Sequence, residues 1–376
     1  MTDKPLKMLI GMPSPDSRGG PINCEPPFVA ALRDLGISVD EETYVYGDGG
    51  STASTFARVR RVADAARRLR ARTRDNEYDL SHLNTSFDER SVLRDLTVLA
   101  AIKGNAPVFL KMHGSSASFL RTKSRAWRAL QTRLFYRVDA IGVLSNEERE
   151  NFAAAGCPAE KLYVVKNALG SETAFSRDDD FRAGQGIDAN IPLLLFSSRM
   201  IATKGLADVI DACGILRDRG RAFSLFCLGD GPERSNAAKQ ALNMGLTQHI
   251  RFTGYVSEAE ASRFHADTDL LLFPTFHDEG LPVVLLKTLA AGQPIITTRI
   301  RAAADYLREP ENCLWVNPRD PVGLAHRIEE MLDNRDIGKR MSENNRKLAA
   351  DFEPENVARE YIDMYRRIAF KPRSKS

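Results

Sequence analysis

The sequence lacks a long apolar run. No stretch approaches the roughly 18 apolar residues that a membrane-spanning helix needs, and residues 1–13 do not have the apolar core of a signal peptide. We therefore expect a cytoplasmic protein whose contact with the inner face of the cell membrane, where there is any, is peripheral.

The sequence also lacks paired cysteines. No Cys-x-x-Cys pair occurs and none of the cysteines lies near a histidine at zinc-ligand spacing, so no structural zinc site is indicated. We expect scattered buried thiols in a reducing compartment, with disulfides as the alternative. The cysteines are Cys24, Cys157, Cys213, Cys227 and Cys313.

Charge of one sign is not in excess. The 376 residues contain 53 Lys and Arg against 50 Asp and Glu, a net charge of +3, so the molecule as a whole is not a polyanion binder. The length exceeds that of one ordinary hydrophobic core, and two domains are the default expectation.

Short apolar runs alternate with longer amphipathic ones along both halves. This alternation predicts an α/β protein with parallel sheets, because parallel strands need long crossover connections. A polar stretch without periodicity predicts a linker over 171–190, between an N-terminal domain at 1–170 and a C-terminal domain at 191–354. The predicted strands are 6–12, 79–83, 108–112, 140–144, 163–165, 192–197, 224–228, 250–253, 270–274 and 294–297.

Two parallel α/β sheets joined by a linker should form a cleft. In open parallel sheets, ligands bind beyond the carboxyl ends of the strands. The loops that follow the predicted strands are therefore the first place to look for functional residues.

Two cations stand in the loop that follows the predicted strand 192–197. Arg199 and Lys204 lie five positions apart at a predicted helix N-terminus. Two positive side chains, unpaired backbone N–H groups and the helix dipole suit a diphosphate. A solvated Arg and Lys near a turn is the alternative.

An acidic turn follows the predicted strand 270–274 and leads into a helix over 282–291. Glu279 lies just ahead of that helix, at the carboxyl end of the strand. It could bind a ligand or cap the helix, and the two roles are compatible.

Four segments in order now resemble a known family: Arg199 to Gly205, LGDGP at 228–232, RFTGYV at 251–256, and EGLP to GQPII at 279–296. Together they resemble the family 4 glycosyltransferases (glycosyl transferases group 1), retaining enzymes of the GT-B fold with two Rossmann-like domains. In that fold the last helix, here within 355–376, packs back on the N-terminal domain.

The resemblance implies roles for individual residues. Arg199 and Lys204 match the cationic pair that binds the donor diphosphate. Glu279 matches the first Glu of the family's E-x7-E motif, which contacts the transferred sugar, and Gly280 and Leu281 match the turn whose amides approach sugar and phosphate. These positions imply a nucleoside-diphosphate sugar as substrate and no metal or other cofactor.

One position departs from the family pattern. The second Glu of the motif, which accepts hydrogen bonds from the nucleotide ribose, would fall on Lys287. A Lys ammonium donates only. Either the ribose is held differently, or donor binding is weak, or the site has decayed. Asp305 matches a downstream acidic position and could take over hydroxyl recognition.

The N-terminal half adds two further candidates by resemblance. Gly19 and Gly20 match a glycine-rich loop that faces the donor diphosphate, with a bare turn as the alternative. His113 follows a predicted strand and matches a family histidine near the reacting carbon, which implies contact with the donor sugar or acceptor. A structural histidine is the alternative.

Two predicted helices are strongly basic. Residues 58–74 hold eight Arg against one Asp, and residues 121–137 hold six Lys or Arg and no acid. Basic helices with interleaved aromatics suit an anionic membrane surface, although a solvated face over a core stripe is the commoner case. Nucleic acid is disfavoured, because no recognition motif occurs. The residues assigned to this surface are Arg121, Lys123, Arg125, Trp127 and Arg128.

We therefore expect a metal-independent, retaining hexosyltransferase that acts on a lipid-linked acceptor or a glycan of the cell envelope. Two alternatives remain open. One is another enzyme on the same fold, an epimerase or a phosphorylase. The other is a non-catalytic scaffold protein in which Lys287 marks a decayed site.

Overall fold

A computed structural model describes residues 5–14, 20–44, 54–102, 106–170, 175, 177–178 and 180–371. The chain divides into two compact units. The first unit consists of Met1–Gly170, Asp278–Val283 and Phe352–Ser376, and the second consists of Ser171–His277 and Val284–Asp351.

The first unit contains a six-stranded sheet in the order β2-β1-β3-β4-β5-β6, and every neighbouring pair is parallel. Each buried strand is a short apolar run, as expected for a parallel sheet that is covered on both faces. The strands are β1 Lys7–Met12, β2 Ser38–Thr43, β3 Leu80–Phe87, β4 Val108–Ser115, β5 Ala140–Val143 and β6 Leu162–Val164.

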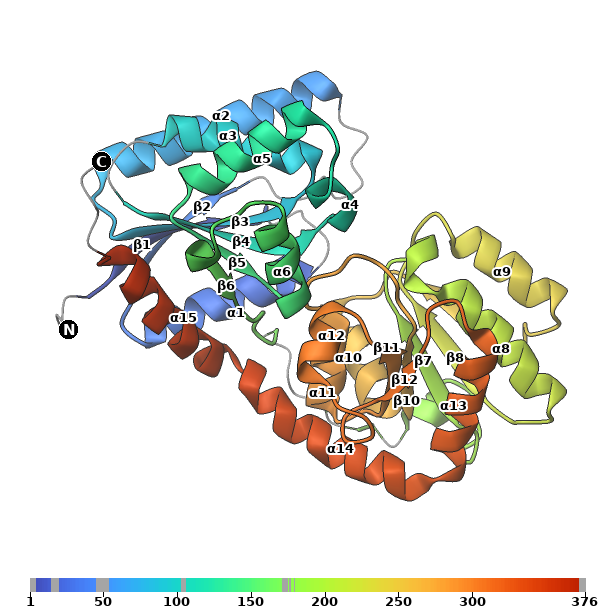
Figure 1. The fold of residues 1–376 in the computed structure, drawn as a ribbon. Coiled ribbons are helices and arrows are strands. Elements are labelled where there is room, and N and C mark those ends of the chain that lie inside the picture. The colour runs from blue at the N-terminus through green and yellow to red at the C-terminus, as the bar shows by residue number, and fades with distance from the viewer. Residues whose placement is uncertain are drawn as a thin grey trace. The chain divides into compact units, whose positions relative to one another are not determined.

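Helices cover both faces of this sheet (Figure 1). Helix α3 packs against both α2 and α5 on one face, and α1 packs against the C-terminal helix α15 on the other. The helices are α1 Gly20–Asp34, α2 Thr55–Asp75, α3 Glu89–Ala101, α4 Ala117–Leu120, α5 Arg125–Arg137, α6 Asn146–Ala154 and α15 Pro354–Ala369, with the short 3₁₀ turns η1 Ala159–Lys161 and η3 Ala350–Phe352.

The second unit contains another parallel six-stranded sheet, in the order β12-β11-β10-β7-β8-β9. The two parallel sheets confirm the predicted α/β fold class. The strands are β7 Leu193–Ser197, β8 Ser224–Leu228, β9 Ile250–Gly254, β10 Leu270–Phe273, β11 Ile295–Thr298 and β12 Leu314–Val316.

The core of the second unit lies between this sheet and the helices α8, α9 and α13, which contribute a continuous cluster of buried aliphatic side chains. These helices lie on one face of the sheet in Figure 1, and α10, α11 and α12 lie on the other. The helices are α7 Phe181–Gly184, α8 Leu206–Asp218, α9 Arg234–Asn243, α10 Glu258–Asp267, α11 Val283–Ala291, α12 Arg301–Tyr306, α13 Pro321–Asp333 and α14 Arg335–Ala349, with the 3₁₀ turn η2 Ala202–Lys204.

The structure divides one predicted helix in two and adds two strands that were not predicted. Helix α1 begins at Gly20, so both Pro26 and Pro27 lie inside it. The basic helix expected over 121–137 is two helices, because the chain leaves α4 at Arg121 and the Ser124 hydroxyl caps α5. Strands β2 and β12 were not predicted, since β2 is polar and β12 has only three residues.

Two further expectations concern the cysteines and membrane-spanning helices. All five cysteines are buried free thiols. Among the described residues, no helix has the length and apolar character to cross a membrane.

A buried histidine in the second unit makes the stability depend on pH. His265 of α10 is 1% exposed, and its Nδ1 lies 3.2 Å from the Gln293 amide oxygen and 3.2 Å from the Thr288 hydroxyl. Burial lowers the pKa of His265 from 6.5 to about 4. Between pH 6.5 and pH 4, His265 is therefore protonated in the unfolded chain but neutral in the folded chain. The free energy of unfolding thus falls as the pH drops through this range.

We predict that a His265→Gln variant depends less on pH than the wild type does. Between pH 7 and pH 5 the wild type should lose about 2 kcal/mol more unfolding free energy than the variant, because one pKa unit corresponds to about 1.4 kcal/mol. Urea unfolding at both pH values measures this difference. Parallel pH dependences in the two proteins would contradict the prediction.

Candidate functional site

The strand order of the second sheet marks one place where a ligand is expected. Read from its other edge, the order is β9-β8-β7-β10-β11-β12, so the chain winds outward in one direction from β7 and in the other from β10. Sheets of this kind bind ligands beyond the carboxyl ends of the strands at such a switch point. The loops after β7 and β10 are the two that meet there.

Backbone hydrogen bonds join these two loops. The amide of Phe276 donates to the carbonyl of Thr203 at 2.8 Å, and the Thr203 hydroxyl lies 2.9 Å from Nδ1 of His277. Gly205, with φ +76°, packs so closely on the Pro274 carbonyl that a Cβ atom would overlap it. The loop that carries Arg199 and Lys204 is thus fixed against the loop after β10.

A third loop, Gly229 to Pro232 after β8, also fixes the loop after β7. The amide of Met200 donates to the Asp230 carbonyl at 2.9 Å, and the amide of Glu233 donates to the Met200 carbonyl at 3.0 Å. Gly229 and Gly231 have φ values of +116° and +158°, and a Cβ atom on either would collide with backbone. The glycines of this motif therefore permit close backbone packing.

The two predicted cations occupy different environments. Arg199 is exposed in the loop after β7, whereas Lys204 is only 4% exposed and its Nζ lies 5.4 Å from the centre of the Phe273 ring. Helix α8 then begins with Gly205 as its N-cap, which offers no side-chain cap to the first N–H groups. An anion near these groups would be stabilised by the helix N-terminus and by both cations.

The segment Asp278–Val283 belongs to the first unit and includes the predicted residues Glu279, Gly280 and Leu281. The Asp278 carboxylate accepts from the Ala117 amide at 3.1 Å, and the Asn167 side-chain amide donates to the Leu281 carbonyl at 3.2 Å. A Cβ atom on Gly280 would come within 3.0 Å of the His113 carbonyl. The structure thus brings the Glu279 turn and the backbone of His113 together.

The imidazole ring of His113 points into a buried network. Its Nε2 lies 2.8 Å from Asn84 Oδ1 and 3.4 Å from a Glu25 carboxylate oxygen, and its side chain is 2% exposed. Burial, followed by the charge of Lys111, holds the pKa of His113 well below 6.5, so the ring is neutral near pH 7. These contacts make its backbone, rather than its ring, the part that borders the Glu279 turn.

Cys24, Glu25 and His113 form a cluster whose donor atoms could in principle hold a metal ion. The ammonium of Lys111, however, lies 2.7 Å from the Glu25 carboxylate, and both side chains are buried. The Cys24 thiol donates to the Gly20 carbonyl at 3.2 Å, and burial raises the pKa of this thiol to about 12. A protonated thiol and a resident ammonium do not suit a cation site.

The position that departs from the family motif has a charged partner. Lys287 of α11 is ion-paired with Glu258, the first residue of α10. Asp305 lies on α12 and is partly buried. Gly20 is the first residue of α1, where a Cβ atom would come 3.0 Å from a methyl group of Val283. Gly19 lies outside the described residues.

The residues assigned to a membrane surface differ in their exposure. Lys123, Arg125 and Arg128 are exposed, and Arg121 donates to the Asn151 side chain at 2.9 Å. The Trp127 ring packs edge-on against Phe119, with 5.4 Å between ring centres, and is partly buried. Trp127 therefore supports the core of the first unit.

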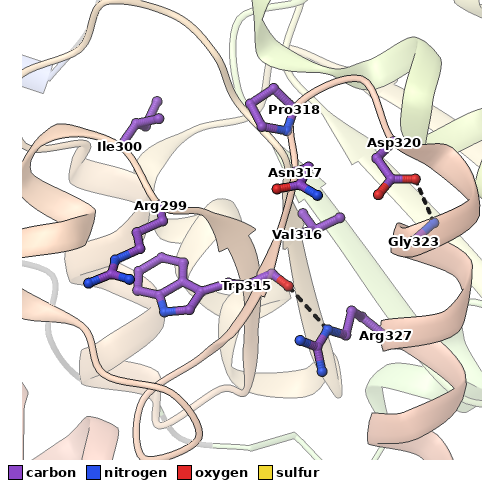
Figure 2. A pocket seen from close by; sticks show the side chains of 9 residues that line it. All are labelled: Arg299, Ile300, Trp315, Val316, Asn317, Pro318, Asp320, Gly323 and Arg327. Atoms are coloured by element: carbon purple, nitrogen blue, oxygen red, sulfur yellow. Dashed lines mark hydrogen bonds between the residues drawn. The ribbon is translucent and has the colours of Figure 1, made fainter.

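A cavity of about 390 Å³ lies elsewhere in the second unit, beside β12 (Figure 2). Figure 2 shows Arg299 and Trp315 on one side of it and Asp320 and Arg327 on the other. Arg327 is already paired with Glu309 and Glu330, and Asp320 caps α13. None of the predicted site residues lines this cavity, which is bordered by Arg299, Ile300, Trp315, Val316, Asn317, Pro318, Asp320, Gly323 and Arg327.

Comparison with protein families identifies the chain. Residues 177–348 match the model of the glycosyl transferases group 1, and residues 27–171 match the model of glycosyltransferase family 4. The chain belongs to the family 4 glycosyltransferases. This membership confirms the resemblance found in the sequence motifs.

Relatives in the family are similar over parts of their length. The lipopolysaccharide core biosynthesis glycosyltransferase LpsE of Rhizobium meliloti is 28% identical over 56% of this chain and 59% of its own length. A GDP-mannose-dependent phosphatidylinositol monomannoside mannosyltransferase of Mycobacterium tuberculosis is 25% identical over 74% of both chains. The match thus spans less than two thirds of LpsE and about three quarters of the mannosyltransferase.

Solved structures show the same fold. Anabaena HepE, in complex with UDP and glucose, superposes with a TM-score of 0.71 at 17% identity over 96% of this chain and 99% of HepE. A glycosyltransferase of Rickettsia africae gives a TM-score of 0.74 at 16% identity over 98% and 100%. The predicted GT-B fold is therefore confirmed.

Four residues of interest were missed in the sequence: Glu25, Asn84, Lys111 and Glu258. One signal was available, because Lys111 and His113 are two apart on a strand and so share a face of the sheet. Nothing in the sequence pairs Lys287 with Glu258, which lies 29 positions away on another helix.

We predict that Gly229→Ala destabilises the protein much more than Gly220→Ala does. Both glycines have positive φ, but Gly220 has open space around it, whereas an added Cβ at Gly229 meets the Ser198 carbonyl. Gly220→Ala should cost about 1–2 kcal/mol for the backbone conformation alone. Gly229→Ala should cost about 3 kcal/mol or more, because overpacking is added. Urea unfolding measures both, and equal losses would show that the loops can move apart.

Proposed function

We propose that this glycosyltransferase moves a sugar from a nucleoside-diphosphate sugar to a hydroxyl group, with retention at the anomeric carbon and without a metal ion. The observation that carries this proposal is the fixed loop at the switch point of the second sheet, with Arg199 and Lys204 beside the uncapped N-terminus of α8. A donor diphosphate is the ligand whose charge suits that arrangement.

The same groups can stabilise the leaving diphosphate during the reaction. As the bond between sugar and phosphate breaks, negative charge develops on the phosphate oxygens. The buried ammonium of Lys204 acts in surroundings from which water is largely excluded, where an electrostatic interaction is stronger. These cations can take the part that a metal ion plays in other transferases.

Retention is proposed from family membership. In the front-face mechanism usual for the family, the diphosphate itself accepts the proton of the attacking hydroxyl, so no side-chain base is needed. The neutral and buried ring of His113 is consistent with this, because it leaves the backbone of His113 and the Glu279 turn to contact the sugar.

The acceptor class is proposed from the relatives. One relative is named for lipopolysaccharide core biosynthesis and another for phosphatidylinositol mannoside. HepE binds UDP and glucose in its crystal structure. We therefore propose a lipid-linked or glycan acceptor of the cell envelope, with a hexose as the transferred sugar.

We predict that Arg199→Ala and Lys204→Met each lower kcat by about 100-fold or more, the loss typical of removing one group that stabilises developing charge. Transfer or donor hydrolysis assays, with donors first found by thermal shift, measure the effect. Lys239→Ala is the matched control, since Lys239 is an exposed cation of the same unit on α9. If neither variant lowers turnover, the diphosphate assignment fails, and a scaffold or epimerase function gains support.

We also propose that helix α5 contacts an anionic membrane surface. Its exposed residues Arg125, Arg128, Arg133 and Tyr136 share one helix face by their spacing. Within the described part of the chain these three arginines form no ion pair. In contrast, several arginines of α2 are paired with Glu42, Asp64 or Asp75. Each exposed arginine of α5 that lies near an anionic surface contributes about 1 kcal/mol to binding.

We predict that reversing three α5 charges, Arg125→Glu, Arg128→Glu and Arg133→Glu, abolishes sedimentation with phosphatidylglycerol vesicles at low salt. The control reverses three exposed cations of α14, Lys339→Glu, Arg340→Glu and Lys347→Glu, and so changes the net charge equally. Equal losses in both triple variants would show only a dependence on net charge. A wild type that stays in the supernatant would end the membrane proposal and leave a glycan acceptor.

A further inference from the structure

The ion pair between Lys287 and Glu258 joins two helices that follow different strands of the second sheet. Lys287 is 9% exposed and lies on α11, which follows β10, and Glu258 opens α10, which follows β9. Burying an ammonium without a partner would be costly. The pair therefore fixes the carboxylate of Glu258 beside α11.

The cap of helix α10 is formed by residues other than Glu258. The N-terminus of α10 is closed by a capping box, in which the Ser257 hydroxyl accepts from the Glu260 amide and the Glu260 carboxylate accepts from the Ser257 amide. The Glu258 side chain is 39% exposed although one of its oxygens contacts Lys287. A carboxylate has about four acceptor positions, and a ligand can reach this one because its side chain is exposed.

The location suits the nucleoside part of a donor. Lys287 is four residues, or about 6 Å, along α11 from its first residue Val283, and so lies one turn beyond the loop that follows β10. Tyr255, just past the end of β9, is 61% exposed and offers an aromatic face for a base. In nucleotide-binding parallel sheets, a carboxylate that follows a strand commonly accepts from a ribose hydroxyl.

We propose that Glu258, held by Lys287, accepts hydrogen bonds from the ribose hydroxyls of the donor nucleotide. Glu258 is then the residue that selects ribose, and Lys287 is a positioning residue. This inference rests on the proposed use of a nucleoside-diphosphate sugar. It assigns the role to Glu258, the carboxylate paired with Lys287, rather than to Asp305, which lies on α12 after β11.

The test compares ribonucleotides with their deoxy counterparts. Calorimetry with UDP, GDP and ADP, and with the 2′-deoxy and 3′-deoxy forms of whichever binds, gives the ribose preference of the wild type, expected to be roughly tenfold. Glu258→Gln should reduce affinity for the ribonucleotide while leaving the deoxy forms little changed, so the preference approaches one. Glu260→Gln is the matched control, because it removes the same charge from the same helical turn and Gln retains the capping box.

An exchange of the two charges tests the positioning role of Lys287. Lys287→Glu alone places two carboxylates together and should lower both the melting temperature and the ribose preference. The double variant Glu258→Lys, Lys287→Glu restores an opposite-charge pair and should recover both. A gain in ribose preference from Lys287→Glu alone would overturn the inference and mark the wild-type site as decayed.

The remaining outcomes separate this inference from the proposed function. If no nucleoside diphosphate binds the wild type, the proposed donor fails and the inference fails with it. If a nucleotide binds but its ribose preference survives Glu258→Gln, only the inference fails. The inference is likewise overturned if Asp305→Asn alone abolishes the preference, or if Glu258→Gln changes the choice among bases instead.

Discussion

The close approach of three backbone loops at the carboxyl end of the second sheet is the constraint on which the donor side depends. The loops after β7, β8 and β10 are joined by main-chain hydrogen bonds. Glycines in these loops allow the close approach, because a Cβ atom at their positions would overlap the neighbouring backbone. Because main chain holds main chain, the positions of Arg199 and Lys204 follow from the fold itself. Two cations on a flexible loop would lose conformational entropy when they bind a diphosphate. Because this loop is already fixed, the entropy lost on binding is smaller.

Buried charge in both units follows a common rule. In the first unit the Lys111 ammonium meets Glu25 of α1, and in the second unit Lys287 meets Glu258 of α10. Each carboxylate comes from a helix distant in sequence. The two pairs differ in exposure, since Glu25 is fully buried and Glu258 remains more than a third exposed. The first pair thus has no free surface for a ligand and orders the network around His113, whereas the second retains a surface that a ligand can reach.

The sequence predicted the sheets well because each buried parallel strand is an apolar run, and the glycine and proline signals around 229–232 and 292–294 are local. Prediction from the sequence failed where contacts between residues distant in the chain determine the local structure. Edge strand β2 is polar and is stabilised by its pairing with β1. The Ser124 cap divides a continuous basic pattern into α4 and α5. Trp127 looks like a surface anchor in the sequence, yet it packs on Phe119. Partners such as Glu25 and Glu258 are set by the fold and leave no local trace.

The difference between Lys287 and the motif Glu shows why such failures matter for function. A motif compares residues at one position, and by that measure the site has lost a carboxylate. A ligand instead responds to the charges and acceptors within reach, whichever helix supplies them. The Lys287 ammonium is paired with the Glu258 carboxylate, so this place on the surface has both a hydrogen-bond acceptor and a cation that balances its charge. The family position is changed, but under the proposal a ribose hydroxyl would still meet a carboxylate, that of Glu258 on helix α10.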